Sequence, residues 1–144
     1  MKSKTSVITT VIAVSGLTLT LNATGATESQ LPAKQKMGEV TYIMGGVGQT
    51  EAAAIEHVAK YYPLELEFLQ KAKSKNEYLS DVQVRIKDAH DKMVLNVNAD
   101  GPFLLAKIPA GKYTVSAERN GRVEHRQVEI TAKDHRRVVF EWQS

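Results

Sequence analysis

Apolar and polar residues alternate with a period of two along much of the chain, as they do in a strand with one buried face. Leu64, Leu66 and Phe68 occupy alternate positions, so we expect a strand that turns these side chains inward. Glu65 and Glu67 lie between them and are expected to face water. Similar patterns and β-branched runs predict other strands at residues 40–44, 82–87, 93–97, 103–108, 112–119, 122–131 and 138–142.

One segment has the spacing of a helix instead. Four apolar residues would share one face of a helix that runs from Glu51 to about Tyr61: Ile55, Val58, Ala59 and Tyr62. Thr50 is placed to cap the start of this helix, and Pro63 is placed to end it. Because its apolar stripe needs a partner, we expect the helix to pack on a sheet.

Turn signals separate the predicted strands. Asn120-Gly121 is a strong signal for a two-residue hairpin loop between the strands at 112–119 and 122–131. Most of the strands have one polar face, as strands of antiparallel sandwiches do. The sequence therefore predicts a mainly β protein, an antiparallel sandwich of about seven or eight strands with one helix near the N-terminal end.

The segment from Asp100 to Val115 places a tight turn, a strand, a second turn and another strand in succession. Its Asp-Gly-Pro-Phe start and its Ile-Pro-Ala-Gly-Lys-Tyr-Thr-Val end resemble a carboxypeptidase regulatory-like domain. The resemblance covers residues 78–142 and implies a small transthyretin-like, or prealbumin-like, β-sandwich. Domains of this family are usually non-catalytic accessory modules. Residues 39–70 would then form a strand–helix–strand extension packed on that sandwich.

The first 26 residues have the layout of a secretory signal peptide. Lys2 and Lys4 precede an uncharged run over residues 5–21, which ends in small residues up to Ala26. Cleavage after Gly25 is an alternative to cleavage after Ala26, and a retained membrane anchor is disfavoured because the apolar run is short and rich in Thr and Ser. We expect a periplasmic or secreted bacterial protein without stable membrane insertion.

The remaining chain is long enough for one domain. Residues 27–38 are polar and predict a flexible leader, and residues 39–144 predict a single domain. The sequence contains no cysteine, which excludes disulfides, thiolate metal sites and a lipid-modified lipoprotein.

The charge of the chain gives no reason to expect nucleic acid as a partner. The chain has 19 basic and 16 acidic residues, and removing Lys2 and Lys4 with the signal peptide leaves 17 against 16. Phosphate binding needs Lys and Arg clustered along one groove, and the sequence shows two modest clusters only.

A glycine-rich loop is the candidate binding site. It lies between a predicted strand and the start of the predicted helix, where backbone amides can bind an anion. It lacks the sequence of a nucleotide-binding loop, and we expect a structural turn. The alternative is a site that binds a carboxylate, a chain terminus or a small polar ligand through Gly45, Gly46, Gly48, Gln49 and Thr50.

The sequence contains no familiar catalytic or metal-binding motif. The four histidines are spread over a helix, a turn and strand regions, and a surface pair of His125 and His135 is the weak alternative for a metal site. Hydroxyisourate hydrolases share the transthyretin-like sandwich, but that family ends in Tyr-Arg-Gly-Ser, whereas this chain ends Glu141-Trp-Gln-Ser144. We therefore expect neither an enzyme nor a bound cofactor.

The expected function is binding or assembly. The resemblance and the signal peptide together imply an exported, non-catalytic β-sandwich that binds an envelope protein, peptide or glycan through strand edges or loops. An unpaired edge strand would also allow a homodimer. The enzyme alternative is a small periplasmic hydrolase that uses His125 or His135 with a nearby acid.

Overall fold

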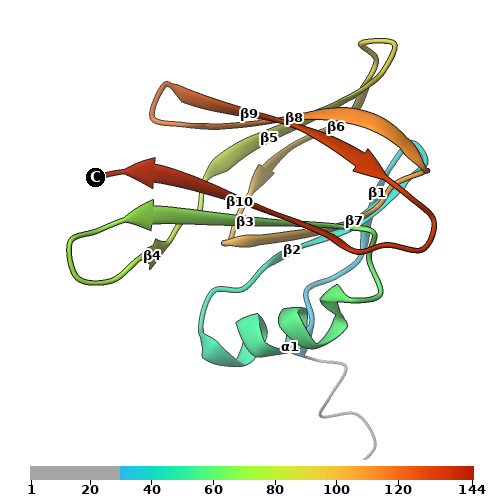
Figure 1. The fold of residues 1–144 in the computed structure, drawn as a ribbon. Helices are drawn as coiled ribbons and strands as arrows, with labels where there is room; N and C mark the ends of the chain where they lie inside the picture. The colour runs from blue at the N-terminus through green and yellow to red at the C-terminus, as the bar shows by residue number, and fades with distance from the viewer. Residues whose placement is uncertain (1–29) are drawn as a thin grey trace, which may run out of the picture.

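The structure is a computed structural model that describes residues 30–144. The predicted signal peptide, residues 1–26, and the start of the predicted leader lie outside the described residues. The described chain is mainly β, with two sheets packed face to face and one helix (Figure 1). No helix among residues 30–144 is long and apolar enough to cross a membrane.

Six strands form sheet A. Its strand order is β1 (Gln35–Met37), β2 (Val40–Gly45), β7 (Phe103–Lys107), β3 (Leu64–Lys71) and β10 (Arg136–Gln143), with β4 (Glu77–Tyr78) paired to the end of β3. Residues 35–37 belong to the predicted flexible leader, yet they form β1 and pair antiparallel with β2. Backbone ladder hydrogen bonds order this exposed polar segment, which the composition alone does not predict.

Sheet B is antiparallel throughout. Its strand order is β6 (Met93–Ala99), β5 (Val82–Asp88), β8 (Gly111–Arg119) and β9 (Arg122–Ile130). The predicted Asn120-Gly121 hairpin is confirmed: it joins β8 to β9, with φ angles of 51° and 75° at the two residues. Positive φ at both loop residues is the conformation that matches the twist of paired strands.

Sheet A is not purely antiparallel, so the prediction of an antiparallel sandwich is wrong for one pair of its strands. β10 runs parallel to β3 over its whole length, from Arg136 beside Leu64 to Gln143 beside Lys71. The chain reaches β10 from sheet B through residues 131–135, and it enters sheet A at the end where β3 begins. The amide of Arg136 donates to the carbonyl of Pro63 at 2.8 Å and starts this parallel ladder.

The helix α1 (Gln49–Ala59) covers part of the outer face of sheet A. Ile55 and Ala59 are buried against Ile43 of β2 and against Phe103 and Leu105 of β7. The helix begins two residues before the predicted start, with Gly48 at the N-cap position and no side-chain cap. Thr50 therefore lies inside the helix, and the prediction that it caps the helix is wrong.

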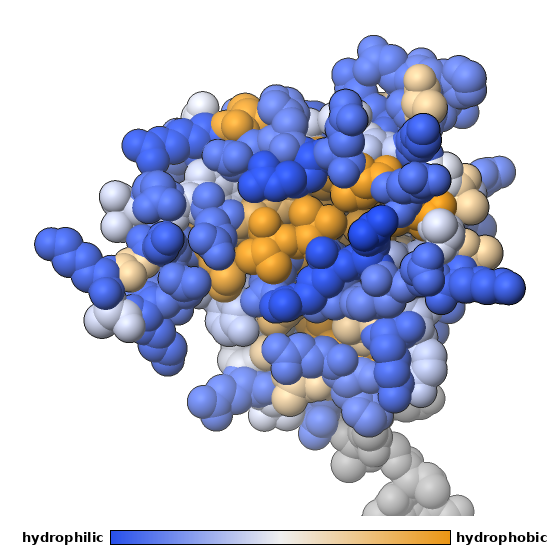
Figure 2. Space-filling view, viewed as in Figure 1, coloured by the Kyte–Doolittle hydropathy of each residue, from blue (hydrophilic) through white to orange (hydrophobic). Residues whose placement is uncertain are grey.

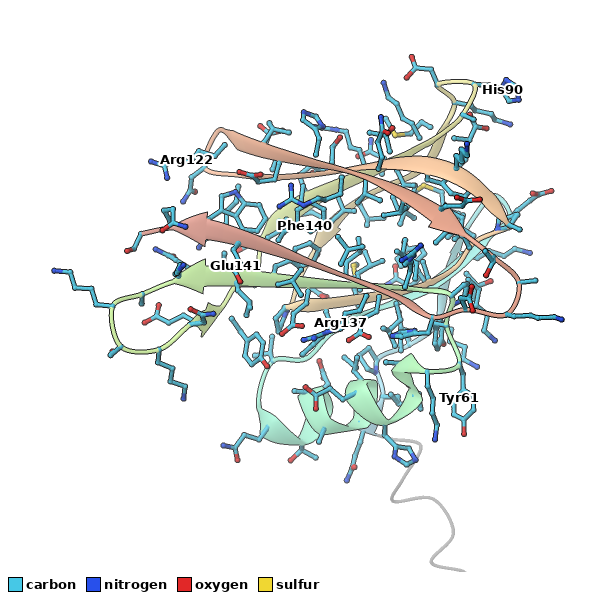
Figure 3. All side chains as sticks on the ribbon, viewed as in Figure 1. Tyr61, His90, Arg122, Arg137, Phe140 and Glu141 are labelled. Carbon is cyan, nitrogen blue, oxygen red and sulfur yellow. The ribbon has the colours of Figure 1, made fainter. Side chains whose placement is uncertain are left out.

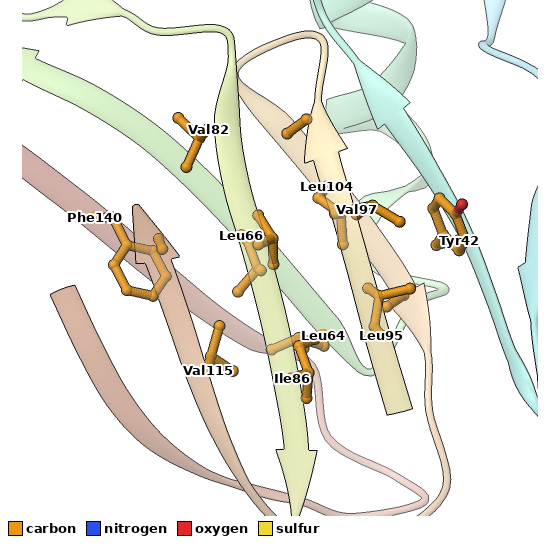
Figure 4. Close-up of a cluster of buried hydrophobic side chains, with 14 of the residues drawn as sticks. Tyr42, Leu64, Leu66, Val82, Ile86, Leu95, Val97, Leu104, Val115 and Phe140 are labelled. Atoms are coloured by element: carbon orange, nitrogen blue, oxygen red, sulfur yellow. The ribbon is translucent and has the colours of Figure 1, made fainter. Parts of the chain in front are cut away.

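The main core lies between the two sheets (Figure 4). Alternate residues of the longer strands point into it, among them Leu64, Leu66 and Phe68 of β3, as predicted. The final strand contributes Phe140 and Trp142, which lie within 6.2 Å of each other between ring centroids. This layered packing is what holds the loops at either end of the sandwich in place.

β9 and β10 are the terminal strands of their sheets, and they lie on the same side of the sandwich. The Trp142 indole donates to the carbonyl of Arg122 at 3.3 Å, and the Arg126 guanidinium lies 5.3 Å from the centre of the Phe140 ring. Figure 2 shows an apolar patch on this side of the molecule, bordered by hydrophilic side chains. Val138 and Val139 of β10 are half-buried there.

Candidate functional site

The glycine-rich loop joins β2 to α1 at one end of sheet A. Gly46 has a φ of 98°, a conformation that favours glycine. A Cβ atom at this position would lie 2.5 Å from the Phe103 ring, so the loop approaches β7 more closely than any side chain would permit. Glycine at position 46 is thus required by conformation and packing before any ligand is considered.

The loop does bind a carboxylate, and that carboxylate belongs to its own helix. The amide of Gly46 donates to Oε1 of Glu51 at 2.6 Å. Glu51 lies in the first turn of α1, where a negative charge also interacts favourably with the helix dipole. This contact occupies the Gly46 amide that an external anion would need in the alternative of a binding loop.

A hollow of about 350 Å³ opens between the loop and the segment around β4. Its lining consists of Gly46, Val47, Gly48, Gln49, Ala52, Tyr78, Leu79, Ser80 and Pro102. Three of the five predicted binding residues, Gly46, Gly48 and Gln49, are among them, whereas Gly45 and Thr50 are not. Two apolar side chains at the hollow are exposed to solvent: Val47 is 67% exposed and Tyr78 is 55% exposed.

Tyr78 is the residue at this hollow that the sequence did not identify. Its ring lies 5.4 Å from the ring of Phe103, measured between centroids and tilted by 51°. Burial raises the pKa of the Tyr78 hydroxyl, and the negative charges of Glu67 and Glu56 raise it further. The phenol is therefore a neutral hydrogen-bonding group at neutral pH. The only signal in the sequence is a tyrosine next to Leu79 in an otherwise polar turn.

The outer face of β3 carries two buried acids, which corrects the prediction that they face water. Glu65 is 5% exposed and Glu67 is 3% exposed. They lie beside the helix-covered half of sheet A, and on their other side they meet Arg137 of β10 and His135, which immediately precedes β10. The Arg137 guanidinium pairs with the Glu67 carboxylate, and its Nε lies 3.8 Å from Oε1 of Glu65.

His135 joins the same cluster. Its Nε2 lies 2.7 Å from Oε2 of Glu65, and its Nδ1 lies 2.7 Å from the carbonyl oxygen of Tyr62. Because a carbonyl oxygen can only accept, Nδ1 is the donor in the second contact. The hydrogen bond to the Glu67 side chain raises the pKa of Arg137, so its guanidinium stays charged. The cluster thus places two carboxylates beside one guanidinium and one imidazole.

The other histidines lie apart from this cluster. His125 is on the outer face of sheet B, where its Nδ1 lies 2.8 Å from the hydroxyl oxygen of Ser116. β9 and β10 belong to different sheets, so strand pairing does not bring His125 next to His135, as the alternative of a two-histidine surface site would require. Within residues 30–144, no three side chains of His, Asp or Glu are grouped closely enough to hold a metal ion.

The geometry offers an apolar hollow with the Tyr78 ring at its rim, next to a cluster of paired charged groups. Such a hollow can accept an apolar side chain, while the Tyr78 hydroxyl and the Gln49 amide can hydrogen-bond to polar groups beside that side chain. No protein-family model matches the sequence, and no curated protein matches it, so the function is inferred from this geometry.

Proposed function

We propose that the chain is an exported, non-catalytic β-sandwich that binds a protein or peptide partner in the hollow between the glycine-rich loop and Tyr78. The observation that carries the proposal is the exposure of Val47 and Tyr78, two apolar side chains at the rim of the same hollow. Exposed aromatic and aliphatic groups beside a recess are typical anchors of protein–protein contacts.

The lining favours an apolar side chain over a glycan. Its hydrogen-bonding side chains are those of Gln49, Ser80 and Tyr78, and the rest of the lining is glycine or apolar. A sugar needs many directed hydrogen bonds, whereas an apolar side chain needs shape and the removal of water. At about 350 Å³, the hollow is near the lower end of ligand pockets, which suits a single side chain.

The charged residues near the hollow support binding rather than catalysis. Glu51 is held by the Gly46 amide, and the Arg137 guanidinium lies beside both Glu65 and Glu67. A general base has to offer an open lone pair to the substrate. These carboxylates are engaged by neighbouring groups, and they serve to hold the loop and the sheet in place.

We further propose that the fold is a member of the transthyretin-like, carboxypeptidase regulatory-like group, as the Asp100–Val115 motif implies. Two packed sheets, with Phe103–Lys107 and Gly111–Arg119 as strands, support that proposal. Export to the periplasm or the exterior rests on the pattern of residues 1–26.

Site-specific photo-crosslinking tests the proposed binding site. A photoreactive phenylalanine derivative is placed at Val47 in the full chain, expressed in its own cells, and in a matched chain it is placed at Val123, an exposed apolar residue of β9. We expect a discrete crosslinked partner from position 47 that is lost when Tyr78→Ala is added. Identical products from both positions, or none from position 47, would contradict the proposal.

One observation favours the hydrolase alternative. Ser116 Oγ lies 2.8 Å from His125 Nδ1, and Arg85 is opposite Ser116 on the neighbouring strand. A serine hydroxyl within hydrogen-bond reach of a histidine is the nucleophile–base pair of acyl transfer, and here the pair lies on an exposed sheet face. Hydrolysis of p-nitrophenyl acetate that disappears in Ser116→Ala and persists in Thr114→Ala would support this alternative.

A further inference from the structure

The free edge of β10 exposes a defined set of backbone groups. The Arg136 amide donates to Pro63, so the even-numbered residues of β10 direct their backbone groups toward β3. The odd-numbered residues therefore direct theirs away from sheet A. Arg137, Val139 and Glu141 are the residues with hydrogen-bonding groups on this free edge.

At the C-terminal end of this edge, a side chain of the same molecule already hydrogen-bonds to the backbone of β10. The Arg122 guanidinium donates to the carbonyl of Gln143 at 3.3 Å, which uses the outward acceptor at the end of the strand. The segment that can pair with another strand runs from Arg137 to Glu141, and its midpoint is Val139. This segment carries the half-buried residues Val138 and Val139 at the side of the molecule that shows the apolar patch (Figure 2).

We propose that β10 pairs antiparallel with β10 of a second copy of this chain, in a register centred on Val139. A twofold axis at Val139 places Arg137 of each copy opposite Glu141 of the other. Residues that exchange backbone hydrogen bonds in this register are the odd-numbered ones, which are those with free groups, and they would form about six interchain hydrogen bonds. The two sheets A would join into one continuous sheet.

The side chains on both faces of β10 are self-complementary in this register. On the outer face, two Arg137–Glu141 pairs flank a central contact between the two Val139 side chains. Arg137 keeps its contacts with Glu67 and Glu65, and its side chain is 56% exposed, so further guanidinium donors are accessible. Figure 3 shows Arg137 and Phe140 on opposite sides of the strand, as the alternation requires.

The inner face fits the same register. Val138 of each copy lies opposite Phe140 of the other, and Arg136 lies opposite Trp142, a pairing of a cation with an aromatic ring. Registers centred on residue 138 or 140 place Arg137 opposite Val139 or Gln143 and lose the charge pairs. The charge pattern therefore selects both the partner, which must carry the same strand, and its register.

β9 does not offer an equivalent edge. Glu124 and Arg126 occupy positions where the alternation of β9 turns side chains toward the other sheet, and they pair with each other at 3.3 Å. Inward-pointing charges are a device that protects an edge strand from pairing. β10 lacks this protection between Arg137 and Glu141, which is why the second copy is assigned to β10.

Sedimentation velocity over a range of concentrations tests the pairing with the full chain. We expect a monomer–dimer equilibrium, and Glu141→Lys should weaken association by about tenfold or more, because two attractive cross-strand pairs become repulsive. Glu129→Lys makes the same charge change on an exposed residue of β9 and should leave the equilibrium unchanged. A monomer at every concentration, or equal effects of the two variants, would overturn the proposal.

The absence of cysteine from the sequence permits a second test that reads the register directly. Val139→Cys brings the two thiols opposite each other at the twofold axis, at a Cα separation of about 5.5 Å that a disulfide can span. Under mild oxidation this variant should form a disulfide-linked dimer faster than Val138→Cys or Val123→Cys. Crosslinking at position 138 or 123 as fast as at 139 would refute the register, and circular dichroism confirms that each variant is folded.

Discussion

At the scale of single residues, Glu65 and Glu67 depend on side chains that come from the other end of the chain. Both carboxylates are almost fully buried, and a buried carboxylate is stable only when it is paired or hydrogen-bonded. Arg137 contributes to both pairs and His135 to one. The acids therefore help to hold β10 beside β3 only as long as their partners are present.

Replacing Arg137 by methionine should expose this dependence. We expect Arg137→Met to lower the free energy of unfolding by about 1–3 kcal/mol, less than for a fully buried pair because Arg137 is 56% exposed. Arg136→Met, a matched change on the other face of the strand, should cost under about 0.5 kcal/mol. Urea denaturation of the wild type and of both variants measures these differences in the free energy of unfolding.

The double variant Glu67→Met with Arg137→Met separates pairing from packing. Because it removes the buried charge together with its partner, it should be more stable than Arg137→Met alone. A double variant that is less stable than the single one would show that Glu67 has another role.

Asp88 gives a prediction of pH dependence. The hydrogen bond from the Lys92 amide, together with that from the His90 amide, lowers the pKa of the Asp88 carboxyl. A lowered pKa in the folded state means that the stabilisation is present above the pKa of the unfolded chain and is lost as the pH falls through the folded-state pKa. The free energy of unfolding of the wild type should therefore approach that of Asp88→Asn as the pH is lowered.

The measurement is urea denaturation of both proteins between about pH 7 and about pH 3. Asparagine keeps a side-chain oxygen that can accept from the two amides but does not titrate. A difference between the two proteins that stays constant over this range would contradict the prediction.

The residues of β3 show what the sequence can and cannot predict about single side chains. Alternation correctly placed Leu64, Leu66 and Phe68 in the core, because apolar residues have one favourable destination. Glu65 and Glu67, which lie between them, had two favourable environments: water or a buried ion pair. The choice depends on Arg137 and His135, which approach β3 only in the folded chain. Tyr78 was missed for the same reason, since Phe103 supports its ring from a distant strand.

At the scale of elements, two turn motifs that are far apart in the sequence lie against each other. A Cβ atom on Gly101, in the turn before β7, would collide with the backbone of Gly45 at the end of β2. Glycine at position 101 is therefore required by the close approach of two chain segments. Because Gly46 and Pro102 line the hollow, this contact also sets the shape of the candidate site.

Gly101→Ala should accordingly destabilise the protein. The added methyl group meets backbone atoms that cannot rotate away, so we expect a loss of about 1–3 kcal/mol in the free energy of unfolding. Gly121→Ala is the comparison, because its added methyl group meets open space and its cost, about 1–2 kcal/mol, comes from the φ of 75° alone. Thermal unfolding measures both variants, and a Gly101→Ala protein as stable as the wild type would contradict the steric explanation.

The elements themselves were largely predictable, and their ends were less so. The hairpin at Asn120-Gly121 and the buried face of the helix follow from local chemistry. The start of α1 was misplaced because the Gly46 amide binds Glu51, a contact that begins the helix without a Thr50 cap. The hollow beside this loop could not be foreseen, since its other wall comes from residues 78–80 and Pro102.

At the scale of the whole molecule, one core joins both sheets. Phe140 and Trp142 of the final strand pack with residues of sheet B and of β3 in a single cluster. The order of strands in each sheet did not follow from the sequence, because alternation shows which face is buried but not which strand is the neighbour. The parallel partner of β10 is the clearest example.

A single core predicts cooperative unfolding. Trp142 is the only tryptophan and is 5% exposed, so its fluorescence reports on the contact between the sheets. Its urea transition should coincide with the loss of far-ultraviolet circular dichroism, which reports on all strands. Two separate midpoints would show that β10 leaves the sandwich before the rest unfolds.

The parallel pairing of β3 with β10 also sets an order of events during synthesis. β3 ends at Lys71 and leaves the ribosome well before β10, which begins at Arg136. Until Arg137 arrives, Glu65 and Glu67 are carboxylates without partners, and hydration opposes their burial under any other segment. The two acids therefore keep that face of β3 hydrated in the nascent chain. The edge of β3 stays unpaired until β10, which carries Arg137, has been synthesised.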